Sequence, residues 1–122
     1  MYATRFRLRK HADYQRVYKA SRKQFAKQIT FFSTLRVTPP GEDPGPPRIG
    51  LTVGKVMGKA VDRNRIKRRM REAVRKHLHL LTAPVDVILH PRRTILTLDF
   101  PLIEREVAQI FRQIQKVAEK QP

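Results

Sequence analysis

The densest group of side chains that could bind a ligand lies between residues 62 and 76, with the sequence DRNRIKRRMREAVRK. Eight of the fourteen residues from 63 to 76 are basic, six of these are arginines, and Glu72 is the only acid. Arginine carries a planar fork of N–H donors that fits phosphate oxygens and can stack on bases. A helix face that is merely solvated usually alternates charge signs, and this one does not. The run therefore predicts binding to nucleic acid, with a solvated helix face as the alternative.

A second group of side chains, near the start of the chain, combines aromatic rings with cations. Tyr14 and Tyr18 are four residues apart, beside Arg16, Arg22 and Lys23. Aromatic rings stack on the bases of single-stranded nucleic acid while nearby cations hold its phosphates. The same spacing also fits the buried side of an amphipathic helix, and from spacing alone core packing is the better interpretation.

Side chains for covalent or metal chemistry are scattered along the chain. There is no cysteine, which excludes disulfides, thiolate zinc sites and cysteine nucleophiles. The four histidines lack the spacing of a metal pair or a nearby carboxylate that would orient them. The ten acids are not clustered as the ion sites of a two-metal nuclease would be. We therefore expect no catalytic residue and no metal ligand among these side chains.

Composition supports a polyanionic partner. The chain has 122 residues, with 27 Lys plus Arg against 10 Asp plus Glu, a net charge of +17. Such an imbalance is most simply explained by a partner of opposite charge. No apolar stretch approaches the ~20 residues that cross a bilayer, and the first residues lack the apolar core of a signal peptide, so we expect no membrane contact and a cytoplasmic location. Apolar residues are spread throughout, which predicts a single domain over 1–122.

The first half of the chain predicts one helix and two strands. Apolar residues spaced by three and four predict a short helix over 11–20. Residues 28–37 and 48–54 are rich in β-branched and aromatic residues and predict two strands, paired antiparallel. Between them the Pro-rich segment 39–47 can sustain neither helix nor strand and must be a loop.

The second half predicts two longer helices around a strand. An apolar stripe with the helical period runs from about residue 60 to 81. Pro84 closes this helix, and residues 85–90 predict another strand, followed by an irregular segment over 91–99 with some strand character. Pro101 suits the first turn of a last helix, whose apolar stripe continues to Val117.

Three stretches together resemble a known family. They are residues 48–75, RIGLTVGKVMGKAVDRNRIKRRMREAVR; residues 8–18, LRKHADYQRVY; and residues 98–100, LDF. The long stretch closely resembles the signature of the bacterial ribonuclease P protein subunit. An Arg-Asn-Arg triplet alone would be weak, but here the preceding strand, the glycine and the following basic helix all agree.

This resemblance implies an α+β fold: a single-domain α/β sandwich of element order α-β-β-β-α-β-α, with a split βαβ unit and a left-handed crossover, in the ribosomal protein S5 domain 2-like class. The family's enzyme is a ribonucleoprotein that removes the 5′ leader of precursor tRNA by magnesium-dependent hydrolysis. Its RNA subunit is the catalyst, and the protein subunit improves substrate and metal binding. The implied partners are the catalytic RNA and precursor tRNA. Magnesium would be held mainly by RNA, and we expect no organic cofactor and no obligate homo-oligomer.

Matched residue by residue, the resemblance implies two sets of site residues. The residues that the resemblance assigns to contacts with the catalytic RNA are Arg63, Asn64, Arg65, Lys67, Arg68 and Arg71. Contacts with the single-stranded leader fall to Tyr14 and Tyr18, with Arg16 and Arg22 beside them, which moves the two rings from core packing toward function. Family members commonly have Phe at both positions, so each Tyr adds a hydroxyl that needs a polar partner if buried. The run from His90 to Arg93 and the loop 39–47 depart from the family pattern and are assigned no role.

Other functions compete with this one. A ribosomal protein or an RNA chaperone would share the charge and sometimes the fold. A basic-helix DNA-binding protein would need a dimerisation seam or a pair of recognition helices, and no heptads follow residue 76. A stand-alone nuclease would cleave precursor tRNA with magnesium and without any RNA subunit.

Overall fold

The helices and strands follow one another in the order that the resemblance implies. The computed structural model describes residues 2–120. The elements are α1 (His11–Ala20), β1 (Gln24–Phe25), β2 (Ile29–Leu35), β3 (Arg48–Leu51), α2 (Ala60–His77), β4 (Val85–Pro91) and α3 (Phe100–Glu119). Short 3-10 turns occupy Thr4–Phe6, Lys55–Met57, Leu78–Leu80 and Arg93–Leu96. The α-β-β-β-α-β-α order is confirmed.

The four strands form one mixed sheet in the order β1-β2-β4-β3. β2 and β4 are antiparallel along their whole length, whereas β3 and β4 are parallel. Helix α2 connects these two parallel strands, so the expected βαβ unit is present. Its strands are direct neighbours, and the unit is not split by a further strand, because β2 occupies the other edge of β4.

The predicted antiparallel pairing of residues 28–37 with residues 48–54 is wrong. β4 lies between β2 and β3 and pairs with both. The first five residues of β4 are all buried, as expected of a central strand whose two faces are both covered. The sequence pattern identifies this strand but does not say which strands it separates.

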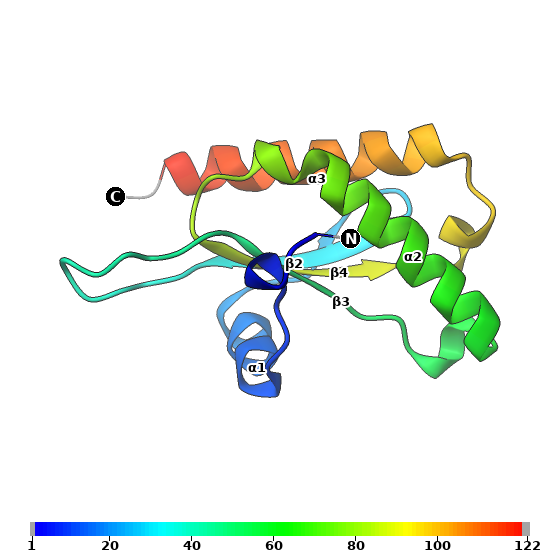
Figure 1. The fold of residues 1–122 in the computed structure, drawn as a ribbon, viewed down its shortest axis with the longest axis horizontal. Helices are drawn as coiled ribbons and strands as arrows, with labels where there is room; N and C mark the ends of the chain where they lie inside the picture. Colours follow the sequence, from blue (N-terminus) through cyan, green and yellow to red (C-terminus); the bar gives the residue numbers. More distant parts are fainter. Residues whose placement is uncertain (1, 121–122) are drawn as a thin grey trace.

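The main core lies between the sheet and helices α2 and α3, which Figure 1 shows on one side of the strands. Alternate residues of a strand point to the same side of a sheet. Accordingly, one row of strand residues packs against both helices; its members are Ile29, Phe31, Ile49, Val87 and Leu89, and their helical partners include Ile66, Met70, Ile103 and Phe111. This side of the sheet is closed to solvent by the two long helices.

The other side of the sheet is covered only in part. The ten-residue helix α1 packs here through a small cluster of Leu8, Val17 and Ile88, with Tyr14 and Phe32 half-buried beside it. Figure 1 shows α1 on the opposite side of the strands from α2 and α3. The Pro-rich loop 39–47 projects beyond the end of the sheet in the same view. The partly open face under α1 is therefore the place where side chains of the sheet can meet a ligand.

The ends of the elements agree with the sequence patterns with small differences. α2 ends at His77 and passes into a 3-10 turn, a few residues before the predicted end at 81. The segment 91–99 contains the turn Arg93–Leu96 in place of strand character, and α3 has a proline in its first turn as predicted. Within residues 2–120, no helix is both long enough and apolar enough to span a bilayer.

Candidate nucleic-acid interface

Helix α2 turns one side to the core and the other outward. Its buried residues are Ile66, Met70, Ala73 and Val74, at the spacing of an amphipathic helix. Asp62 lies in the first turn and three basic residues lie in the last turn, an arrangement that complements the helix dipole. The local sequence thus fixes which arginines point away from the core.

The six residues of α2 that are predicted to contact RNA fall into two groups. Asn64, Arg65 and Arg68 are exposed, whereas Arg63, Lys67 and Arg71 are half-buried. Arg71 extends toward the N-terminal segment, where it lines a cavity of about 160 Å³ together with Arg7, Arg9 and Tyr14. The structure therefore brings one residue of the predicted α2 set next to a residue of the predicted leader set.

One arginine of the basic run serves the fold. Arg69 donates from Nη1 to the carbonyl oxygens of Ile95 and Leu96, at 2.8 and 2.9 Å, and from Nη2 to the carbonyl oxygen of Leu98. These carbonyls belong to the segment between β4 and α3, so Arg69 fixes that segment on α2. Nothing in the sequence distinguishes Arg69 from its basic neighbours.

The aromatic residues of α1 meet side chains from the sheet. Tyr18 packs edge-on against Phe32 of β2, with ring centroids 4.8 Å apart, and its centroid lies 5.9 Å from that of His90 on β4. The Tyr18 hydroxyl and Nε2 of His90 are 2.9 Å apart and share a hydrogen bond. Tyr18 keeps 37% of its surface exposed. We call Tyr14, Tyr18, Phe32 and His90 the aromatic cleft, a name for these four neighbouring rings, of which Tyr14 also lines the cavity beside Arg71.

Tyr14 is half-buried and lies across β3. Its ring centroid is 6.5 Å from that of Tyr18. A Cβ atom at Gly50 would overlap with the Tyr14 ring, at 2.7 Å from Cζ, so this close approach requires glycine. Burial raises the pKa of the Tyr14 hydroxyl, and the nearby Tyr18 adds to this effect, against the smaller influence of the Leu51 backbone N–H and Arg71. The phenol is therefore neutral at physiological pH.

Two residues of the aromatic cleft, Phe32 and His90, were not identified from the sequence. Both lie on the α1 side of the sheet, since they alternate with the core residues Phe31 and Leu89. Burial lowers the pKa of His90, and the charge of Lys23 lowers it further, so the imidazole is neutral near pH 7. The period-two alternation of β2 was the available signal for Phe32. His90 had no comparable signal because its partners come from α1 and β2.

The two arginines predicted beside the tyrosines have different surroundings. Arg16 donates from Nη2 to the carboxylate of Asp86 and forms an ion pair with Asp13 at 3.6 Å. Arg22 is exposed just beyond α1 and lines a separate cavity of about 240 Å³ with Ser33 and other residues. The contacts of Arg16 hold it on the α1 side of the sheet, which carries the aromatic cleft. Arg22 instead lines the separate cavity.

Together these surfaces offer two kinds of contact to a nucleic acid. Guanidinium groups on α2 can bind phosphates, and the rings under α1 can stack on unpaired bases. In the part of the chain from 2 to 120, no group of three or more His, Asp or Glu side chains could hold a metal ion.

The fold and these surfaces define a small α+β protein with a basic helix on one side and an aromatic cleft on the other. A family model described as Ribonuclease P matches residues 2–115. The ribonuclease P protein component of Bacillus velezensis is 34% identical over 109 residues, which cover 89% of each chain. That of Bacillus pumilus is 31% identical over 118 residues, covering 97% of this chain and 94% of its own. The chain belongs to the ribonuclease P protein family.

Solved structures agree with this assignment. The RNase P protein of Staphylococcus aureus matches with a TM-score of 0.71 at 29% identity, covering 93% of this chain and 97% of that chain. The RNase P protein of Thermotoga maritima matches with a TM-score of 0.72 at 22% identity, covering 88% and 96%, a likeness that concerns the fold. The resemblance identified from the three sequence stretches is confirmed.

Proposed function

We propose that this chain is the protein subunit of a cytoplasmic ribonuclease P ribonucleoprotein, whose RNA subunit removes the 5′ leader of precursor tRNA by magnesium-dependent hydrolysis. The chain supplies binding surfaces and no catalytic group, and the magnesium ions are held mainly by RNA. Membership of the family supports this proposal. The observation that carries it is the presence, on one small domain, of exposed arginines along α2 and a partly exposed aromatic cleft under α1.

The exposed residues of α2 form the contact with the catalytic RNA. Within residues 2–120, the side chains of Asn64, Arg65 and Arg68 have neither an ion pair nor a hydrogen bond to another residue. Their donors are therefore available to phosphate oxygens. A hydrogen bond to a charged group contributes about 1.5–3 kcal/mol, so a few such contacts give a substantial part of the affinity.

The aromatic cleft holds the single-stranded leader. Its rings stack on leader bases, each stack being worth about 1–3 kcal/mol, while Arg16 and neighbouring cations hold the leader phosphates. Mature tRNA has no leader and makes none of these contacts. The cleft thus gives the complex a preference for precursor over mature tRNA, which favours release of the product.

The basic surface also reduces the demand for magnesium. Two folded RNAs repel each other through their phosphates, and divalent ions normally screen that repulsion. A protein of net charge +17 supplies part of the same neutralisation when its cations displace the counterions of the RNA. The protein therefore matters most at low magnesium concentration.

Two adjacent arginines provide a matched test of this proposal. Arg68→Ala and Arg69→Ala remove the same charge from neighbouring positions, but Arg68 is exposed and Arg69 binds three carbonyls. We expect Arg68→Ala to weaken association with the catalytic RNA by about 1.5–3 kcal/mol with unchanged thermal stability. Arg69→Ala should chiefly lower the free energy of unfolding, because three carbonyls lose their donor.

The measurements are RNA affinity by filter binding at several salt concentrations and unfolding by circular dichroism. If Arg68→Ala binds the RNA as tightly as the unmodified protein does, α2 is not the contact surface. If instead Arg68→Ala unfolds at a lower temperature and Arg69→Ala does not, the two arginines have been assigned the wrong way round.

A further inference from the structure

Asp86 is the one fully buried charged side chain in the part of the chain that the structure describes. It lies on β4, on the same side as Ile88 and His90, and so faces α1. Burial would raise the pKa of Asp86, but hydrogen bonds from Arg48 and Arg16 and the charge of Arg36 outweigh it, so the pKa is lowered and the carboxylate is ionised. A charge of this kind is costly to bury unless its partners satisfy it.

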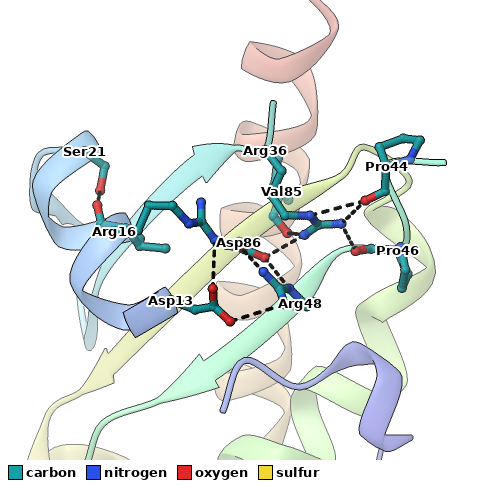
Figure 2. Close-up of polar contacts among 10 residues, drawn as sticks. Asp13, Arg16, Ser21, Arg36, Pro44, Pro46, Arg48, Val85 and Asp86 are labelled. Carbon is teal, nitrogen blue, oxygen red and sulfur yellow. Dashed lines mark hydrogen bonds and ion pairs between the residues drawn. The ribbon is translucent and has the colours of Figure 1, made fainter. Parts of the chain in front are cut away.

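Three arginines bind this carboxylate, and each comes from a different part of the fold (Figure 2). Arg16 belongs to α1, and Arg36 directly follows β2 at the start of the Pro-rich connection. Arg48, from β3, binds both carboxylate oxygens, from Nε and Nη2, each at 2.8 Å. Asp86 therefore ties α1, β3 and the Pro-rich loop to the central strand.

Two of the three arginines have their donors occupied by the protein. Arg36 makes five hydrogen bonds, to Asp86 and to the carbonyl oxygens of Val85, Pro44 and Pro46. Arg48 also reaches Asp13 with Nη1, at 3.4 Å. These two side chains stabilise the fold and have few free N–H donors for a ligand.

Arg16 is different because only one of its nitrogens is engaged. Nη2 contacts Asp86 and Asp13, while Nε and Nη1 have no partner among residues 2–120. The side chain is 42% exposed. It comes from the same helix as Tyr14 and Tyr18, between the two rings in sequence, so the contact that fixes Arg16 also restrains that helix on the sheet.

We infer that Asp86 and its arginines are positioning residues for the aromatic cleft: they set how α1 lies on the sheet and hold Arg16 ready for a leader phosphate. This inference rests on the proposed function of the cleft. The register supports it, because Phe32 pairs with Ile88, two residues along β4 from Asp86, and His90 follows two residues later on the same face. A change at Asp86 is transmitted to the rings through α1 and β4, without Asp86 touching RNA.

The sign of the effect distinguishes positioning from simple electrostatics. Asp86→Asn removes a negative charge, so electrostatics alone predicts tighter binding of every RNA. Positioning predicts that the precursor-to-mature affinity ratio falls by about tenfold, the loss of roughly one stacking contact. Glu42→Gln is the matched control, since it makes the same charge change at an exposed loop residue whose side chain has no hydrogen bond or ion pair within 2–120, and it should leave the precursor-to-mature affinity ratio unchanged.

Arg48→Lys is the second variant, because Asp86→Asn leaves three arginines without their carboxylate and can unfold the protein. It preserves the net charge but loses the two-nitrogen contact with Asp86. Both variants are assembled with the catalytic RNA, and affinities for precursor and mature tRNA are measured beside thermal unfolding of the free protein. The expected result is a reduced ratio in each variant that still folds.

An unchanged ratio in a folded variant overturns the inference and assigns the cluster to stability alone, as does failure of both variants to fold. The double variant Tyr14→Ala with Tyr18→Ala separates this outcome from failure of the proposed function. If that double variant leaves the precursor-to-mature affinity ratio unchanged, the leader does not bind in the cleft. Leader binding by the cleft and positioning by Asp86 then both fail. If the double variant lowers the precursor-to-mature affinity ratio while Asp86→Asn and Arg48→Lys leave that ratio unchanged, only the positioning role fails.

Discussion

Gly50→Ala places a single methyl group under the ring of Tyr14 and so perturbs the aromatic cleft without changing charge. The added Cβ would lie 2.7 Å from Cζ and 3.2 Å from Cε2 of Tyr14. Carbon atoms at optimal contact are about 3.5–4.0 Å apart, so the ring must move by roughly 1 Å. Residue 50 does not have a positive φ, and alanine therefore adds no backbone strain there.

The magnitudes follow from this geometry. Overpacking by a methylene lowers the free energy of unfolding by about 1–3 kcal/mol. Replacing glycine by alanine raises it by about 0.4–1 kcal/mol, because alanine restricts the unfolded chain. We expect the free energy of unfolding to fall by about 1–2 kcal/mol. Displacing the ring removes one base stack worth about 1–3 kcal/mol, which weakens binding of precursor tRNA by roughly 5- to 150-fold. Affinity for mature tRNA should be unchanged.

The assay is precursor and mature tRNA affinity of the reconstituted complex, with urea unfolding of the free protein. Gly54→Ala is the control, since a Cβ there meets nothing within 4 Å. In a Tyr14→Ala background, Gly50→Ala should no longer cost stability, because the clashing ring is gone. Loss of stability by the same amount in both backgrounds would refute the contact reasoning, and an unchanged precursor affinity would show that Tyr14 does not touch the leader.

Three further predictions follow from other contacts. Because the pKa of Asp86 is lowered in the folded protein, its contribution to stability is fully present above the pKa of an aspartate in the unfolded chain and is lost as pH falls through the lowered pKa of the folded state; urea unfolding between neutral and acid pH should show that loss, and Asp86→Asn should reduce it. Arg65→Ala with Arg68→Ala should reduce the steepness with which the logarithm of the RNA-binding constant falls with the logarithm of the salt concentration, by about 0.7–0.9 per lost phosphate contact. An unchanged slope would exclude both arginines from the interface. Tyr18→Phe removes the hydrogen bond to His90 and should cost about 0.5–1.5 kcal/mol of stability with leader affinity nearly unchanged, so a large loss of affinity would show that the hydroxyl itself binds RNA.

Much of the fold could be predicted because it depends on local pattern. The helical period over about 60–81 predicts α2 and its buried side, although the helix itself ends at His77, and the apolar run at 85–90 predicts β4. The order of the strands could not be predicted, since insertion of β4 between β2 and β3 is a pairing between distant segments. β1 has only two residues, too few for any period to show.

The candidate site divides in the same way. The exposed positions of Arg65 and Arg68 follow from helical spacing, so they can be predicted from the sequence. The role of Arg69 does not, because the carbonyls that it binds lie 26 to 29 residues away along the chain. The pairing of Asp86 with three arginines was equally hidden, since these partners come from three separate segments.

Reconstitution with the RNA subunit tests whether this chain assists an RNA catalyst. Precursor tRNA is incubated with the ribonuclease P RNA across a magnesium titration, with and without the full chain, and mature 5′ ends are quantified. We expect the protein to raise cleavage strongly at low magnesium, high magnesium to mask this effect, and the protein without RNA to yield no product. Cleavage by the protein alone would show that the protein is itself a nuclease, and an equal effect of the protein at every magnesium concentration would show that it does not act by neutralising charge.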